Sequence, residues 1–538
     1  MPLCLLHGKA ETDYEPASQE TGLALVKPHV DTAETRRGYL IMFFRTSRAA
    51  LYPATDRPWS VETHGIEAVE DTDRHGTSRE LLWVWLAANI SVIAVVYGAI
   101  LTTIGLNLWE GAFAAIVGSV LSCLAVGVLS VAGKWGGSPT LSLSRLPFGT
   151  RGNLGPAVVS WISLLGWEVV TAVVAAEVLL ALFDASFHVS ATTDLGLMAI
   201  ALVLAISLTL GRLGHATIAA IQFYVSWILG LFTLILIPLL LERVKWNVVA
   251  QGHPASWENV LGGISIVAAA GGISWANLSA DYSRYLPRSE PNGSVVWWTT
   301  IGSALPLIFL IVVGILLSNT VSNLAANPNP IAVLETVLPS WMAIPYLLAA
   351  FIGLMVQMVM GLYSSGLNLM VLRVRAKRSK TVLIDGILIL LVGAYVISAR
   401  QEFLGLFTSF IELLACGIAT WAAVFIADMA VHYKYHRLEL HQLYSAQLPS
   451  PRKELNLPAL FAWLTGTIVG LSFTATPVFT GFLANGIFGR TNLGYFIGSV
   501  ISAAIYANPA ARKARSNRNL PRSSPALSSS EVSTPFGQ

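Results

Sequence analysis

Repeated apolar runs, each about 20 residues long and separated by short polar connections, organise this chain. A helix of that length crosses the ~30 Å hydrocarbon core of a bilayer. Only 12% of the 538 residues are charged, whereas soluble domains carry about 25%. We therefore expect an all-α integral membrane protein, because a helix satisfies its own backbone hydrogen bonds in lipid.

About twelve such runs can be placed, with ends accurate to a few residues. They predict five spans within residues 79–241, five more within 259–435, and two additional helices within 456–507. Residues 1–78 and 508–538 contain no run long enough to cross a membrane, and their polar composition predicts tails that are largely disordered.

The distribution of Lys and Arg predicts the orientation of the spans. Alternate connections carry most of these residues, with the densest group at Arg373–Lys380. The intervening connections carry only Arg243, Lys245, Arg400 and Arg490. Because cytoplasmic loops hold the excess of Lys and Arg, we expect a multi-pass protein of the cell membrane with both termini in the cytoplasm.

The stretch Ile264–Arg288 begins as an apolar helix and changes character at Gly271-Gly272. Non-helical backbone at membrane depth is tolerated only where it lines a cavity or is buried in protein. The glycines alone would equally fit a site of close helix packing. The polar and aromatic half that follows favours a solute site instead; its members include Ser274, Trp275 and Asn277.

A tryptophan and a glutamate are adjacent in the middle of the third predicted span, as Trp167-Glu168. An ionised side chain there costs at least ~2.5–3.5 kcal/mol, so Glu168 is expected to face protein or water and to serve a solute or proton path. Trp167 and Trp275, facing one cavity, could hold a flat ring between them. Hydrogen bonds to the edge of that ring are expected from Asn89, Glu168, Thr171, Ser274, Asn277 and Gln357.

Several classes of protein are disfavoured by what the sequence lacks. It contains no P-loop, no G-x-S-x-G elbow and no His/Glu metal spacing. Cys4, Cys123 and Cys416 show no metal or redox spacing either. We expect neither an enzyme nor an ATP-driven pump, with no cofactor, no metal and no nucleic-acid partner. The expected partners are the lipid bilayer and a small solute.

Short motifs follow one another in order over about residues 65–435: Arg74–Thr77, Arg145–Gly149, Gly166-Trp167, Ser274–Ala276, Ala280–Pro287, Leu362–Leu367 and Ile426–Asp428. Their order and spacing on twelve spans resemble the nucleobase–cation symporter family 1, and within it the purine–cytosine permease branch.

This resemblance implies a LeuT-type architecture. Spans 1–5 and 6–10 would form two inverted repeats, with two extra helices added and with spans 1 and 6 broken at the substrate. A base would stack on Trp167 and Trp275, while polar groups of spans 1, 3 and 8 read its edge. The protein would be a secondary active transporter that imports its solute by cation symport with alternating access.

The sequence departs from the family pattern where specificity is expected. Thr171, Gln357 and Gly361 stand at positions where the family tends to place Asn. The cargo could therefore be cytosine or a purine, or another small ring such as allantoin, a hydantoin or a vitamin-like heterocycle. A membrane sensor without transport is an alternative, and an amino-acid carrier is disfavoured by the two indoles.

Two coupling ions are compatible with the sequence. Glu168, next to the indole, is a protonatable group and favours proton symport. The hydroxyls of Ser364 and Ser365, together with carbonyls from the broken part of span 1, could instead bind sodium. We favour the proton. Asp281 and Arg284 are assigned to structure, at the end of the sixth span.

Overall fold

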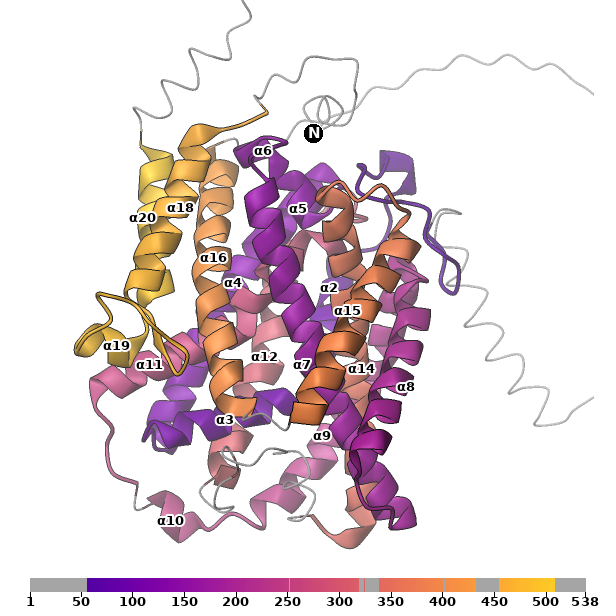
Figure 1. Cartoon of the computed structure of the whole chain (residues 1–538), viewed down its shortest axis with the longest axis vertical. Helices are drawn as coiled ribbons and strands as arrows, with labels where there is room; N and C mark the ends of the chain where they lie inside the picture. The colour runs from indigo at the N-terminus through magenta and orange to yellow at the C-terminus, as the bar shows by residue number, and fades with distance from the viewer. Residues whose placement is uncertain are drawn as a thin grey trace, which may run out of the picture. The chain divides into compact units, whose positions relative to one another are not determined.

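Long α-helices make up most of the chain in the computed structural model (Figure 1). The structure describes residues 56–250, 252–318, 324, 338–399, 403–431 and 454–508. The helices are α2 Glu80–Asn89, α3 Val92–Thr103, α4 Leu108–Gly136, α5 Thr140–Leu143, α6 Arg145–Phe148, α7 Leu154–Phe187, α8 Thr193–Gly211, α9 His215–Leu241, α10 Trp246–Ala250, α11 Trp257–Ala268, α12 Asn292–Ser318, α14 Ser340–Val371, α15 Arg378–Ala399, α16 Phe403–Val431, α18 Leu457–Ser472, α19 Ile487–Thr491 and α20 Gly494–Ala507. Shorter elements are η1 Asp71–Asp73, η2 Ala269–Ile273, η3 Ala276–Tyr282 and the strands β1 Ala475–Thr476 and β2 Phe479–Thr480.

The predicted membrane spans are confirmed as helices, with one correction. Among the described residues, nine helical segments are long and apolar enough to cross a membrane, and α2 with α3 form a tenth as a bent pair. The last two predicted spans are shorter than expected, with 16 residues in α18 and 14 in α20. Apolar residues continue between them, but they form a small antiparallel hairpin and α19 instead of extending either helix.

Spans 1 and 6 are both broken, as predicted. The axes of α2 and α3 differ by 57°, and Ser91 begins α3 with its side chain accepting a hydrogen bond from the Ile93 amide. In span 6, α11 passes into the π-helical turn η2, where Gly271 has φ −84° and ψ −112°, outside the helical region. The chain resumes as the 3₁₀-helix η3. Span 6 therefore consists of two helical segments joined by an unwound centre.

Glycine is required at the break for a packing reason as well. A Cβ on Gly272 would lie 2.2 Å from the carbonyl carbon of Ser122 in α4, closer than real Cβ atoms approach. The Gly272 amide donates to Ser122 Oγ at 3.0 Å. The freed backbone of span 6 therefore finds a partner in α4, which lipid would not supply, and close helix packing at the glycine pair is confirmed.

Other close helix contacts also depend on glycine. In the contact between α3 and α12, a Cβ on Gly98 would lie 2.0 Å from Ile311 O, and one on Gly314 would lie 2.0 Å from Val95 O. Small residues let membrane helices approach this closely. Elsewhere α14 packs along α7, while α18 and α20 pack together beside α16 at one side of the bundle (Figure 1).

The segment from Asp56 to Ser78 packs on the helices, so the predicted tail ending at residue 78 is too long. Glu62 is buried and pairs with the guanidinium of Arg284, which follows η3. The Tyr285 hydroxyl donates to the same carboxylate at 2.5 Å. Burial raises the pKa of Glu62, but Arg284 and Arg378 outweigh burial and lower it to about 2. Arg284 is thus paired and buried, as a structural residue would be, whereas residues 1–55 lie outside the described residues.

This buried pair gives a stability prediction. Glu62→Gln leaves Arg284 buried without its carboxylate, so we expect a loss of about 3–5 kcal/mol and a lower thermal midpoint for the purified protein in detergent. The folded pKa of about 2 lies below the usual value of 4.5 for a glutamate. The carboxylate therefore stabilises the fold fully above pH 4.5 and loses this effect as the pH falls toward the folded pKa. The difference in thermal midpoint between wild type and Glu62→Gln should therefore become smaller as the pH is lowered from 4.5 toward 2.

The matched control is Glu454→Gln. Glu454 pairs with Arg151 at 2.9 Å, and both side chains are nearly two-thirds exposed, at 64% and 63%. Surface pairs of this kind contribute roughly 0–1 kcal/mol, so the midpoint should hardly change. Equal thermal midpoints for Glu62→Gln and Glu454→Gln would contradict the proposed contribution of Glu62 to stability.

Candidate functional site

A cavity lies where the two broken spans meet α7 and α14. Its walls combine apolar side chains with a small number of polar groups, as is usual for small-molecule sites. The lining residues are Ala88, Asn89, Ser91, Ile93, Ala94, Tyr97, Leu164, Trp167, Glu168, Thr171, Ala270, Ser274, Trp275, Leu307, Gln357, Met358 and Gly361.

Both predicted indoles line this cavity. Trp275 follows the unwound centre of span 6 and is only 8% exposed. Its ring meets Trp85 edge to face, with centroids 5.9 Å apart and planes at 83°. Trp167, on α7, meets Phe407 in the same manner at 5.5 Å and 90°. Such edge-to-face contacts stabilise the orientation of each ring, so the two indoles form fixed walls.

Glu168 and Gln357 bring unpaired oxygens to the cavity from facing helices. Within the described chain, neither carboxylate oxygen of Glu168 has a hydrogen-bond partner, and the same holds for Gln357 Oε1. A buried polar atom without a partner costs about 1–3 kcal/mol, and native structures rarely tolerate it without a functional reason. Hydrogen-bond donors on a bound solute would satisfy these oxygens.

Three further polar side chains of the cavity donate within their own span. Asn89 Nδ2, Thr171 Oγ1 and Ser274 Oγ each donate to a backbone carbonyl of that span, at 2.9, 2.8 and 2.7 Å. They retain acceptor capacity on the amide oxygen and on the hydroxyl lone pairs, and Asn89 retains its second N–H.

Gly361 contributes space instead of a polar group. A Cβ at this position would lie 3.1 Å from Glu168 Cγ and 3.2 Å from Glu168 Oε1. Contacts that short force a neighbouring side chain to shift, so the missing side chain gives the carboxylate of Glu168 its room.

Asn277 is the predicted contact residue that the structure places elsewhere. It is not among the described residues that line the cavity. Its Nδ2 donates to Ser160 Oγ on α7 at 2.9 Å, and Asn368 Nδ2 on α14 donates to the same oxygen at 2.7 Å. Asn277 therefore contacts α7 directly, and through the shared Ser160 hydroxyl it links η3 to α14.

The predicted sodium ligands do not come together. The α14 residue beside the break in span 1 is Gly353, where a Cβ would lie 3.0 Å from Ile90 O. Ser364 and Ser365 are about three helical turns further along α14, roughly 16 Å away. They face the carboxylates of Asp281 and Asp385 instead.

Sequence reasoning did not single out Ser91 or Tyr97, which also line the cavity. Ser91 caps the start of α3, directly after the break. Asn89 and Ser91 are two polar residues inside an apolar run, and this pattern could have indicated that Ser91 lines the site. Tyr97 stacks on Phe407 with planes at 13°. An aromatic residue in an apolar span carries no such signal.

Comparison with known proteins identifies the family. A family model described as permease for cytosine/purines, uracil, thiamine and allantoin matches residues 68–498. YxlA of Bacillus subtilis, which carries the name of a purine–cytosine permease, is 25% identical over 463 residues, covering 83% of this chain and 95% of that protein. The purine–cytosine permease FCY2 of Saccharomyces cerevisiae is 24% identical over 309 residues, about half of each chain at 56% and 55%.

Among solved structures, the chain is similar to Mhp1, a nucleobase–cation-symport-1 family transporter in a closed conformation with bromovinylhydantoin bound. The TM-score is 0.69 at 18% identity, covering 85% of this chain and 96% of that one. This likeness confirms the predicted LeuT-type fold. The chain is a multi-pass membrane transporter and not an enzyme, and it belongs to the family of permeases for cytosine/purines, uracil, thiamine and allantoin.

Proposed function

We propose that this transporter imports a small planar heterocycle that presents N–H donors, a nucleobase or a related ring, by proton symport. The observation that carries the proposal is the pairing of two indole walls with unpaired oxygens on Glu168 and Gln357 in one cavity. Flat rings stack on indole faces, and the N–H edge of a ring suits the unpaired oxygens of Glu168 and Gln357.

The comparisons support this class of solute without choosing within it. The matched family model spans cytosine, purines, uracil, thiamine and allantoin, and the structural relative holds a substituted hydantoin. Nucleobases, allantoin and hydantoins are small rings with several N–H donors. The departures at Thr171, Gln357 and Gly361 still leave the individual ring open, with allantoin, hydantoin and vitamin-like rings as alternatives to cytosine and purines.

Glu168 is the residue proposed to couple transport to protons. It is buried, it lines the cavity, and Gly361 leaves room for its carboxyl group. A protonated carboxyl would be tolerated at this depth far better than an ionised one. If the proton and the solute both bind one conformer preferentially, the two gradients become coupled.

Sodium coupling is the weaker alternative. The serines that could serve as ligands lie about three helical turns from the break in span 1, and they face Asp281 and Asp385. The proposed cellular context is the cell membrane with both termini in the cytoplasm, as the Lys and Arg distribution predicts.

A solute screen tests the proposed class directly. Purified protein in liposomes with an inward proton gradient should accumulate at least one of labelled cytosine, adenine, hypoxanthine and allantoin, and unlabelled leucine should not compete. Binding of a ring without accumulation would instead indicate a sensor. Competition by leucine would indicate an amino-acid carrier, and either result would contradict the proposal.

Trp275→Ala should reduce uptake of the accepted ring at least tenfold, since it removes one wall of the cavity. Stacking contributes roughly 0.5–1.5 kcal/mol beyond the area buried, and ~1.4 kcal/mol corresponds to tenfold. Initial uptake rates and the affinity for the ring are the measurements. Trp297→Ala, which removes a tryptophan that is 60% exposed on α12, is the control and should transport normally. Near-normal uptake by Trp275→Ala would remove that residue from the site.

Glu168→Gln should flatten the dependence of uptake on external pH, because an amide keeps the shape of the side chain and cannot exchange a proton. Wild-type uptake should rise as the outside is acidified and should collapse when a protonophore is added. Glu412→Gln is the control: Glu412 is buried in α16, where Asn492 donates to it at 2.6 Å. An unchanged pH profile in Glu168→Gln would limit Glu168 to a structural role.

A further inference from the structure

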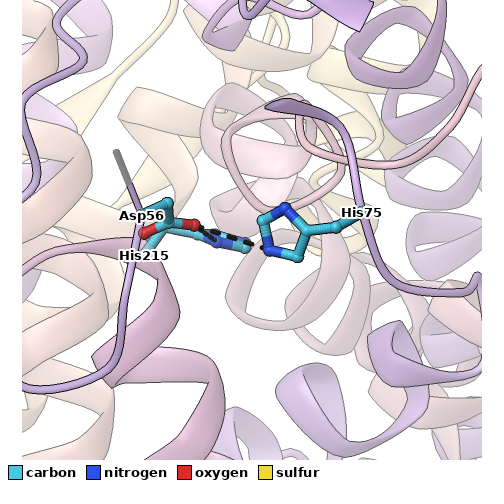
Figure 2. Close-up of side chains that lie close together, drawn as sticks. All are labelled: Asp56, His75 and His215. Carbon is cyan, nitrogen blue, oxygen red and sulfur yellow. Dashed lines mark hydrogen bonds and ion pairs between the residues drawn. The ribbon is translucent and has the colours of Figure 1, made fainter. Parts of the chain in front are cut away.

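Three side chains distant in sequence meet outside the substrate cavity: Asp56 and His75 of the N-terminal segment, and His215 at the start of α9 (Figure 2). One ligand atom from each lies within 4.8 Å of the other two. Asp56 Oδ2 is 3.0 Å from His215 Nδ1 and 3.7 Å from His75 Nε2. Figure 2 shows both imidazole rings directed toward the carboxylate.

These separations fit a tetrahedral metal site. With metal–nitrogen and metal–oxygen bonds of about 2.0–2.2 Å, tetrahedral ligand atoms lie roughly 3.3–3.5 Å apart. The two measured distances to Asp56 Oδ2, 3.0 and 3.7 Å, fall on either side of that value.

Backbone hydrogen bonds orient His75 and Asp56 in the way that is usual for metal ligands. His75 Nδ1 donates a hydrogen bond to the Asp73 carbonyl at 3.0 Å. The other ring nitrogen, Nε2, faces Asp56. Asp56 Oδ1 accepts the Ala216 amide at 3.0 Å, which leaves Oδ2 for the histidines. Metal-binding histidines almost always donate their other ring N–H to a carbonyl or carboxylate, and ligating carboxylates are themselves hydrogen-bonded.

The surroundings also fix one ring and leave a route for entry. The His215 ring stacks on Tyr285 with centroids 4.5 Å apart and planes at 26°, so its plane is fixed. Asp56 and His215 are buried, whereas the His75 side chain keeps 12% exposure. An ion would enter past His75.

From this geometry we infer that Asp56, His75 and His215 form a binding site for a divalent transition-metal ion of the zinc class. Two imidazoles and one carboxylate are ligands that suit zinc and its neighbours in the series. Three protein ligands leave one position for water. The ion joins the segment preceding α2 to the start of α9, and so stabilises the packing of residues 56–75. The inference is independent of the proposed solute and coupling ion.

Metal titration of the full-length protein tests this inference. The protein is purified in detergent with a tag that contains no histidine, treated with EDTA and then titrated with Zn²⁺ by calorimetry and with Co²⁺ by visible absorption. We expect one high-affinity ion per chain, the visible bands of tetrahedral Co²⁺, and a higher thermal midpoint with Zn²⁺. Absence of saturable binding by the wild type would overturn the inference, and would leave the three side chains as a hydrogen-bonded cluster only.

Two conservative variants separate metal binding from folding. His75→Asn keeps a donor for the Asp73 carbonyl and removes Nε2, while Asp56→Asn keeps an acceptor for the Ala216 amide and removes the charge. Each should weaken Zn²⁺ binding at least tenfold and abolish the midpoint shift, while elution from gel filtration stays unchanged. His253→Ala, which removes an exposed histidine, should bind like wild type. Equal affinity in wild type and both variants would place the ion elsewhere and overturn the assignment.

Discussion

The unwound backbone at the centre of span 6 is the constraint on which the rest of this structure depends. In lipid its freed amides and carbonyls have no water to bond, so neighbouring protein must satisfy them. The structure does so with Ser122, whose hydroxyl accepts the Gly272 amide at 3.0 Å. That contact requires glycine at position 272, because a Cβ there would lie 2.2 Å from the α4 backbone.

With the break held in this way, two side chains reach positions that a continuous helix would not give them. Ser274 bonds back to the unwound turn at 2.7 Å, and Trp275 enters the cavity. The second break, between α2 and α3, opens the opposite wall at Asn89 and Ser91. The two breaks therefore bring Asn89, Ser91, Ser274 and Trp275 to one cavity.

Much of this arrangement could be predicted from sequence because its signals are local. Apolar run length indicates spans, and a Gly-Gly followed by polar residues indicates a break. Trp167 and Glu168 are conspicuous because each is unusual in mid-span. Gly361 was identified for its position, but its contribution, room for Glu168, became evident only from the distances between α7 and α14.

The parts that sequence reasoning missed depend on distant contacts or on helix register. Glu62 lies 222 residues before Arg284 in the sequence. Polar residues before the first span look like a solvated tail until such partners are known. Asn277 donates to Ser160 of α7, a contact between spans that becomes visible only when the helices are placed side by side. Ser364 and Ser365 have suitable hydroxyls, but the register of α14 against span 1 places Gly353 at the break.

A structure with the transported ring bound is the most direct test of the central claim. The account predicts that the ring lies between Trp167 and Trp275, with its N–H edge within hydrogen-bond distance of Glu168 and Gln357. A ring bound outside the cavity, or bound inside it with its N–H groups directed away from both side chains, would contradict the account.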